Sequence, residues 1–432
     1  MIMEYKKIYY PGVDETIYAG EHSTGLGVFV IPKKGFSKKY AVIGTKFGSI
    51  NNTFVPLGED KAVTVPDGVA HFLEHKMFEQ SDGSNAFDKF SIYGANANAY
   101  TSFTCTCYLF SCTEHFNESF EHLLSYVQDP YFTEENVSKE QGIIGQEIRM
   151  YDDEGSWQVS MNTLKALYHN NPVRIDIAGT VESISEITKD TLYQCYNTYY
   201  NPSNMAVTVC GDVDPDEIFE LVEKNIRTDR PTGMVQSFFP EEPESVCTDY
   251  IETKSSVALP LFAIGFKDNY LTKGDEMLRR EIAINLICKL IAGRSSGLYS
   301  EMYSQGLIND EFGFDNMTEE SFSCSVICGE SAEPKKVQQL VWDKICELRE
   351  KGFDADDFER LKKAYIGRFM RSFNDVDEIA GMVERNILNG VNIFNLVDVM
   401  QTVDMDYITS VFNQVYTKDT MVLSVVWPMD NE

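Results

Sequence analysis

The chain has 432 residues, of which 37 are basic and 67 are acidic, so its formal net charge at pH 7 is −30. This charge argues against a nucleic-acid-binding protein, which needs a basic face, and against binding to an anionic membrane surface. Hydrophobic residues make up 43% and aromatic residues 12% of the chain, which excludes a disordered acidic protein. We therefore expect a globular protein with an acidic surface and two or three domains.

The first residues and the cysteines lead us to expect a protein that is not exported. The first ten residues lack the apolar core and the cleavage site of a signal peptide, and no apolar run is long enough to span a bilayer. The ten cysteines form no compact framework and no C-x-x-C pair. We interpret them as buried, reduced thiols of a cytoplasmic protein, with a cysteine-based metal site as the weaker alternative.

Strand and helix patterns alternate along the first half of the chain. Hydrophobic periodicity predicts strands at residues 25–31, 40–47, 94–111 and 207–211. It predicts helices at residues 67–80, with Asp67 as the N-cap, and at 115–127, 134–151 and 214–225.

A stretch with three prolines and no sustained period, residues 227–245, interrupts this alternation. Afterwards strands at 256–266, 321–328 and 421–427 alternate with helices at 275–292, at 334–351, from 354 and from 376. The two halves match in order at a period of roughly 200 residues, although no strong residue-level repeat is visible. We predict an α+β fold of two similar domains, residues 1–228 and 248–432, joined by a linker at 229–247.

Two of the six histidines lie four residues apart, in the run His71-Phe-Leu-Glu74-His75. Positions i and i+4 share one face of a helix, so both imidazoles could bind one zinc ion. Glu74 would lean over the same site without being a ligand, and H-x-x-E-H is the motif of the inverzincin zinc peptidases. The alternative is a helix that carries ordinary surface histidines.

A catalytic zinc site needs a third protein ligand and an open position for water. Glu140 and Glu147 lie two turns apart in a predicted helix and therefore share a face. Gly142 and Gly145 lie between them, where each costs about 1 kcal/mol relative to alanine. Close approach to a neighbouring helix would explain that cost. The alternative for the two glutamates is a solvated helix face.

Together the runs His71–His75, Asn98–Ser102 and Glu140–Ile148 resemble the motifs of pitrilysin/insulinase-family zinc peptidases. The resemblance is to the bacterial branch related to mitochondrial processing peptidase, and it covers essentially the whole chain. It implies two similar domains, each a mainly antiparallel sheet covered by helices, which form one half of a clam-like peptidase chamber.

The resemblance also implies roles for five residues of this motif set. His71, His75 and Glu147 would bind one zinc ion per chain. Glu74 would be the general base that activates the zinc-bound water, and Glu140 would support the site by orienting a ligand imidazole. Manganese or cobalt could occupy the same ligands in a test tube.

Residues Asn98, Ala99 and Tyr100 resemble the family's edge strand, to which an extended peptide adds as a further strand. Asn98 would then contact the substrate backbone near the scissile bond. The alternative is a plain core strand.

One part of the family pattern is missing. Active members also use an Arg and a Tyr that follow a Gly-Ser-rich turn; here the turn is residues 292–299. Tyr303 stands where the Arg is expected, and Asn309 or Asp310 where the Tyr is expected. We therefore expect the catalytic half of a heterodimer whose homologous partner subunit supplies the Arg/Tyr pair, with a homodimer as the alternative.

The sequence thus predicts a zinc endopeptidase that acts on peptides or small unfolded proteins. The alternative is a non-catalytic peptide-binding or structural subunit of a heterodimeric complex. A third possibility is the maturation of one particular secreted or antimicrobial peptide. Acidic residues that lined a closed chamber would favour basic peptides.

Overall fold

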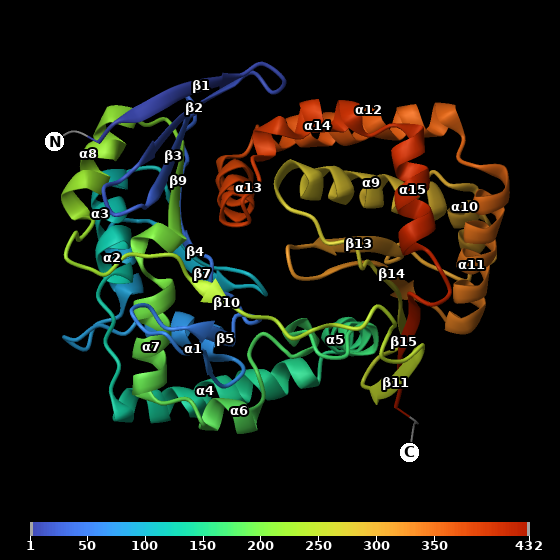
Figure 1. Ribbon diagram of the computed structural model, residues 1–432, viewed down its shortest axis with the longest axis horizontal. Coiled ribbons are helices and arrows are strands. Elements are labelled where there is room, and N and C mark those ends of the chain that lie inside the picture. Colours follow the sequence, from blue (N-terminus) through green and yellow to red (C-terminus); the bar gives the residue numbers. More distant parts are fainter. Residues whose placement is uncertain (1–2, 430–432) are drawn as a thin grey trace. The chain divides into compact units, whose positions relative to one another are not determined.

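The computed structural model describes residues 3–429 and consists of two compact units (Figure 1). Unit 1 comprises the chain up to Gln146 together with Asp176–Phe239 and Phe369–Asn395. Unit 2 comprises Glu147–Ile175, Pro240–Arg368 and the chain from Leu396. Each unit is therefore assembled from segments that lie far apart in the sequence.

Unit 1 is built on a seven-stranded sheet of order β1-β2-β3-β9-β4-β8-β7. All neighbouring strands are antiparallel except β3 and β9, which are parallel. A small second sheet has the order β10-β5-β6. The strands are β1 Tyr5–Tyr10, β2 Glu15–Glu21, β3 Gly27–Pro32, β4 Lys39–Thr45, β5 Thr53–Val55, β6 Val63–Thr64, β7 Asn96–Thr101, β8 Thr106–Cys112, β9 Met205–Gly211 and β10 Gln236–Ser237.

Helices cover both faces of the large sheet. Side chains alternate along β8, so that the ring of Tyr108 contacts Phe78 and Tyr126 on one face. Cys107 points to the other face, toward α13. The helices of unit 1 are α1 Val69–Lys76, α2 Ala86–Ile92, α3 Phe116–Val127, the first part of α4 Glu134–Asp152, α6 Val181–Ser185, α7 Lys189–Tyr199, α8 Pro215–Asn225 and α13 Val376–Leu388.

Unit 2 is built on a five-stranded sheet of order β11-β15-β12-β14-β13. Its strands are β11 Tyr250–Ser255, β12 Leu261–Lys267, β13 Gly313–Thr318, β14 Ser323–Glu330 and β15 Met421–Pro428. Its helices include α5 Gly155–Leu167, α9 Gly274–Ala292, α10 Gly297–Ser304, α11 Pro334–Lys351, α12 Ala355–Ser372 (its last turn counted with unit 1), α14 Leu396–Thr402 and α15 Met405–Val415. No helix within residues 3–429 combines the length and apolarity needed to cross a membrane.

The two sheets share one topology. Strands β3-β9-β4-β8-β7 and strands β11-β15-β12-β14-β13 follow the same chain order, and in both sheets only the first pair is parallel. The predicted α+β class and the duplication of a mainly antiparallel sheet covered by helices are therefore confirmed.

Each half of the sequence contributes one helix to the sheet of the other half. Helix α5 packs on β12 and β15 in unit 2, whereas α13 packs on β4 and β9 in unit 1. The predicted domains, residues 1–228 and 248–432, follow the order of the chain and therefore place α5 in the first domain and α13 in the second. That division stays a prediction.

The N-cap prediction for the first helix is wrong. Helix α1 begins at Val69 with Gly68 as its N-cap, at φ 88°. Asp67 instead accepts a hydrogen bond from Nδ2 of Asn52 at 2.9 Å. A Cβ at Gly68 would lie 2.3 Å from the carbonyl oxygen of Ala178, so both the backbone conformation and the space require glycine.

The predicted strand at residues 94–111 is a hairpin. Strands β7 and β8 pair antiparallel, and the turn between them is closed by a 2.8 Å hydrogen bond from the Ser102 backbone N–H to the Cys105 carbonyl. The Ser102 hydroxyl also accepts the Cys105 N–H at 3.0 Å. Without Gly or Pro at its centre, this turn has no strong signal in the sequence.

Most of the thiols follow the prediction. All ten cysteines lie within residues 3–429 and are free, and seven of them are buried. Cys247 is exposed, and Cys328 and Cys346 are half-buried, so burial was wrongly predicted for these three.

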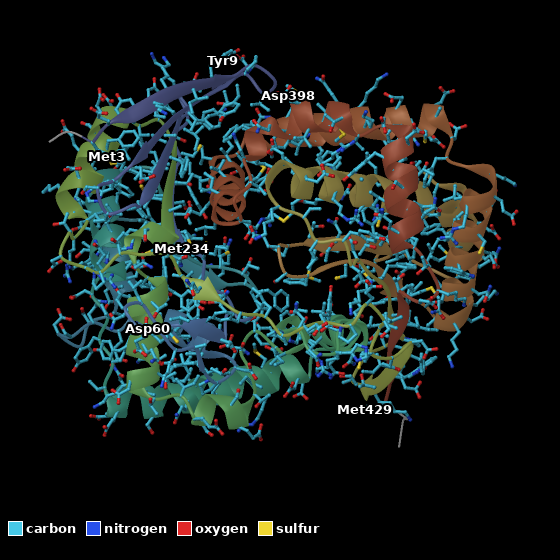
Figure 2. All side chains as sticks on the ribbon, in the orientation of Figure 1. Met3, Tyr9, Asp60, Met234, Asp398 and Met429 are labelled. Atoms are coloured by element: carbon cyan, nitrogen blue, oxygen red, sulfur yellow. The ribbon has the colours of Figure 1, made fainter. Side chains whose placement is uncertain are left out.

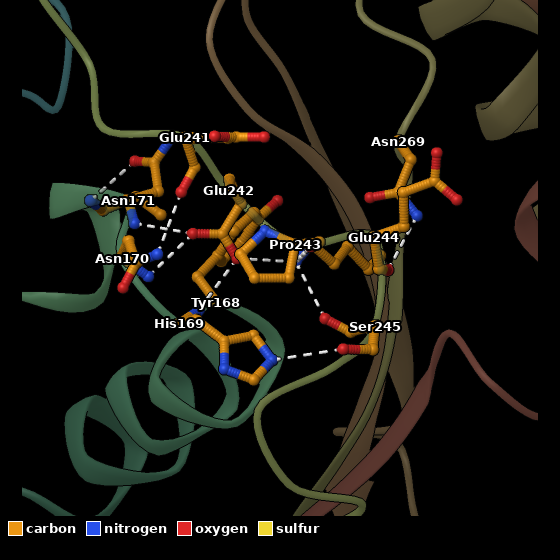
Figure 3. Close-up of polar contacts among 12 residues, drawn as sticks. Tyr168, His169, Asn170, Asn171, Glu241, Glu242, Pro243, Glu244, Ser245 and Asn269 are labelled. Atoms are coloured by element: carbon orange, nitrogen blue, oxygen red, sulfur yellow. Dashed lines mark hydrogen bonds and ion pairs between the residues drawn. The ribbon is translucent and has the colours of Figure 1, made fainter.

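The predicted linker is held at two places. Gln236 and Ser237 form β10, which pairs with β5 in unit 1. Within unit 2, Glu242 accepts the backbone N–H groups of residues 169–171 and the ammonium of buried Lys267 at 2.7 Å (Figure 3). Just before the first of these places, the side chain of Met234, which Figure 2 labels, is exposed.

Candidate metal centre

Helix α1 presents the predicted motif on one face. Phe72 and Leu73 are fully buried and fix the helix against the core of unit 1. At 100° per residue, His71, Glu74 and His75 then share the opposite face. The ring centroids of the two histidines lie 4.6 Å apart.

The structure brings all three predicted metal ligands together. One candidate ligand atom from each of His71, His75 and Glu147 lies within 4.8 Å of the other two. Glu147 belongs to α4, a continuous helix that begins in unit 1 and also carries Glu140. Two imidazoles and one carboxylate form a donor set that suits a catalytic zinc ion, so the residues fit the implied metal.

Burial favours the metal-binding form of His71. Burial, followed by the neighbouring His75, lowers the pKa of His71 to about 3. Its imidazole is therefore neutral at pH 7, which is the form that binds metals.

Glu140 supports the second histidine. Its Oε1 lies 3.1 Å from Nδ1 of His75, and its Oε2 lies 3.5 Å from Nζ of Lys76. Burial raises the pKa of Glu140, but the hydrogen bond from His75 and the charge of Lys76 outweigh it, so the pKa lies below its ordinary value. An ionised Glu140 accepts a hydrogen bond from the Nδ1–H group of His75, which leaves Nε2 of His75 available for a metal.

The explanation offered for Gly142 is wrong. A Cβ at Gly142 would meet no atom within 4 Å, so no neighbouring helix requires a glycine there. Nothing in the structure explains this glycine.

Glu74 is held by a strand. The Thr101 hydroxyl of β7 donates a 2.7 Å hydrogen bond to Oε2 of Glu74, whose side chain is buried. We assigned no role to Thr101 from the sequence. The period-2 alternation of β7 places Ala97, Ala99 and Thr101 on one face, but no signal in the sequence links that face to Glu74.

A cavity of about 530 Å³ adjoins this group. Glu74, His75 and Glu140 line it together with Asn98 and Ala99 of β7. The stacked rings of two phenylalanines, 4.2 Å between centroids, form an apolar part of its wall (Phe78 and Phe87).

Strand β7 lies at the edge of the seven-stranded sheet, as the resemblance implies, and is not a core strand. Asn98 and Tyr100 are exposed, and Ala99 is half-buried. The strand pairs on one side with β8, so its other side can accept an extended peptide. The binding of a peptide there stays a prediction.

The positions where the family's Arg and Tyr are expected lie in unit 2. Tyr303 is 48% exposed and stacks on Tyr299 of the same helix, α10. Asn309 donates to the Glu330 carboxylate at 2.6 Å. Arg294, in the preceding turn, donates to the backbone carbonyl of Asp310.

Comparison with known proteins identifies relatives over the whole chain. The family model described as insulinase (peptidase family M16) matches residues 55–181, and the model of the peptidase M16 inactive domain matches residues 186–365. The chain is 42% identical to the uncharacterised zinc protease YmfH of Bacillus subtilis, over 98% of this chain and 99% of that protein.

Two solved structures have the same fold. A structure described as an M16-like peptidase from Alicyclobacillus acidocaldarius superposes with a TM-score of 0.92 at 31% identity, over 99% of both chains. Pitrilysin superposes with a TM-score of 0.76 at 16% identity, over 100% of this chain and 47% of that one. At that identity the likeness to pitrilysin shows the fold alone.

Proposed function

Because the chain belongs to the insulinase family, peptidase family M16, we propose that it is a zinc-dependent endopeptidase that hydrolyses peptides or small unfolded proteins. The observation that carries this proposal is the convergence of His71, His75 and Glu147 beside Glu74 at the wall of a cavity. The H-x-x-E-H motif supplies two of these ligands and the base.

The residues divide the chemistry among them. A zinc ion held by His71, His75 and Glu147 would polarise the scissile carbonyl and lower the pKa of a bound water. Glu74 accepts a proton from the attacking water and later delivers it to the leaving amine. The Thr101 hydroxyl fixes one oxygen of Glu74 for this transfer.

The cavity offers a place for the substrate. Asn98 and Ala99 lie in the cavity wall and on the edge strand, so a peptide added to β7 would pass directly by Glu74. In this proposal backbone pairing supplies affinity, and the pocket selects among side chains.

The alternative, a non-catalytic peptide-binding or structural subunit, is not favoured. A subunit without activity has no need for three converging metal ligands and a held base. The match to an inactive domain covers residues 186–365, a range that contains none of the proposed metal ligands.

The test compares metal content with turnover. In Glu74→Gln the ligands remain and the base is lost, so we expect about one bound zinc per chain and turnover reduced by about 10²–10⁴-fold. His71→Ala should lose both zinc and turnover, and Glu135→Gln, an exposed residue of α4, is the matched control. Zinc is measured by mass spectrometry, and turnover with quenched fluorescent peptides, with and without 1,10-phenanthroline. Undiminished turnover in Glu74→Gln would rule out the proposed mechanism.

We also propose a partner and a location. A homologous subunit would supply the Arg/Tyr pair, because Tyr303 and Asn309 or Asp310 stand at those positions here. The alternative is a homodimer, in which a second copy of this chain forms the other half of the chamber. If the partner is a homologous subunit, the purified chain alone should cleave peptides slowly, and full activity that is insensitive to added partner would contradict the heterodimer. The free thiols support a reducing, cytoplasmic location, which cell fractionation would test.

A further inference from the structure

Lys76 directly follows the candidate ligand His75, and its side chain is 0% exposed. A buried ammonium group is costly unless it is paired with carboxylates and hydrogen-bonded. The Lys76 ammonium pairs with the carboxylate of Glu79 and, at 3.5 Å, with Oε2 of Glu140. This lysine therefore links Glu79 of the cavity wall to Glu140, the residue that contacts His75.

Glu140 is held by both of its carboxylate oxygens. Oε1 faces Nδ1 of His75 at 3.1 Å, and Oε2 faces Nζ of Lys76. The Glu140 side chain is only 12% exposed, so little water is available to replace either contact. With both oxygens held, rotation of the carboxylate away from the imidazole would break a buried ion pair.

We propose that Lys76 is a positioning residue of the metal centre: it holds Glu140 against His75 and thereby strengthens metal binding. The proposal rests on the proposed function, because it assigns His75 as a metal ligand. Lys76 belongs neither to the candidate metal ligands nor to the cavity lining, and it acts through Glu140. Residues of this kind typically change metal affinity or activity by about 10–100-fold when they are removed.

The sign of the effect separates positioning from simple charge. A lysine that acted only through its charge would repel a dication, so its removal would raise zinc affinity. A lysine that holds Glu140 in place has the opposite effect, because its removal frees the carboxylate and loosens the His75 ring. A lysine that only fills space would change thermal stability without changing zinc affinity.

The experiment measures zinc affinity of the full chain by competition with a chromogenic chelator, together with thermal unfolding of the metal-free protein. Lys76→Met keeps the length and the apolar stem of the side chain and removes the charge. We expect zinc affinity to fall about tenfold. Lys189→Met is the matched control. Lys189 forms an exposed ion pair with Glu134, which lies on α4, the helix that also carries Glu140. If Lys76→Met does not fold, Lys76→Gln allows the same measurement.

A second background shows whether the effect passes through Glu140. In Glu140→Gln, where Lys76 has no carboxylate to hold against His75, adding Lys76→Met should change zinc affinity by less than about twofold. Equal losses in both backgrounds, or an unchanged or higher affinity in Lys76→Met, would overturn the proposal. If the wild type bound zinc without cleaving peptides, only the proposed function would fail. A wild type that bound no zinc would refute both.

Discussion

Two equivalent helix–sheet interfaces, α13 on β4 and α5 on β12, use the same close approach. A Cβ at Gly44 of β4 would lie 2.7 Å from Cδ1 of Leu388 in α13. A Cβ at Gly265 of β12 would lie 2.7 Å from Cγ2 of Thr163 and 3.2 Å from Cδ1 of Leu167 in α5. In both interfaces a glycine lets the helix lie directly against the strand.

The interfaces differ in the polarity of one residue. Glu384 of α13 lies over Gly44 where Thr163 of α5 lies over Gly265. The Thr163 hydroxyl donates to a carbonyl of its own helix at 2.7 Å, whereas Glu384 is fully buried and accepts the Thr208 hydroxyl at 2.5 Å. Burial raises the pKa of Glu384 to about 8, although the hydrogen bond from Thr208 opposes this.

The difference teaches that the backbone fixes the approach of the helix but not the polarity of the contact. A carboxyl group is tolerated in place of a hydroxyl as long as it stays protonated. Glu140, near the metal centre, shows the reverse case, since His75 and Lys76 lower its pKa despite burial.

Glu384→Gln should remove the pH dependence of the α13 interface. The pKa of Glu384 is about 8 in the folded state, above the ordinary glutamate value of 4.5, so its protonation stabilises the fold fully below pH 4.5. This stabilisation is lost as the pH rises toward 8. At 1.36 kcal/mol per pKa unit, the wild type loses up to about 5 kcal/mol relative to Glu384→Gln over this range.

The measurement is urea unfolding of both proteins at pH 5 and pH 8. Glu378→Gln, an exposed position of the same helix, is the control and should show no such difference. A wild type and a Glu384→Gln variant that respond equally to pH would contradict the raised pKa assigned to the buried Glu384 carboxyl group.

Gly44→Ala and Gly265→Ala should break the two interfaces alike. Each added Cβ would lie within 3 Å of side-chain atoms of the packed helix, so we expect a loss of about 1–3 kcal/mol in the free energy of unfolding. Gly142→Ala, a helical position with open space, should instead gain up to about 1 kcal/mol. Calorimetric melting of the three variants tests this, and stabilisation by either strand substitution would be the contrary result.

Lys38→Ala should have the smallest effect. Lys38 pairs with Asp377, on the same helix as Glu384, but their side chains are 46% and 35% exposed. Exposed pairs contribute about 0–1 kcal/mol and weaken with salt. Unfolding in low and high salt measures this effect. A loss well above 1 kcal/mol in the free energy of unfolding would show that the exposed Asp377 contributes as strongly as the buried Glu384.

Much of the site could be predicted because its signals are local. His71, Glu74 and His75 lie within one helical turn or so, and helical periodicity alone places them on one face. The spacing of Glu140 and Glu147 is equally local. That these two helices meet at one point was supplied by the family resemblance, not by periodicity.

Other parts depend on contacts between distant segments. Thr101 reaches Glu74 only because β7 pairs at the sheet edge beside α1. Lys76 reads as an ordinary charged residue until α4 brings Glu140 to it. The hairpin turn at residues 102–105 lacks glycine and proline, so the sequence showed one strand where there are two.

The sequence by itself determined the class of fold, the duplication and the residue types of the metal centre, because periodicity and spacing act along the chain. The tertiary structure decided which half of the chain covers which sheet, and which carboxylates are paired or isolated. The stretches Ile43-Gly-Thr-Lys46 and Ile264-Gly-Phe-Lys267 share three residues, too few to be noticed as a repeat. The role of these stretches is visible only in the tertiary structure, where a helix from the other half of the sequence packs against each glycine. Burial and contact depend on distances in space, which the sequence does not give.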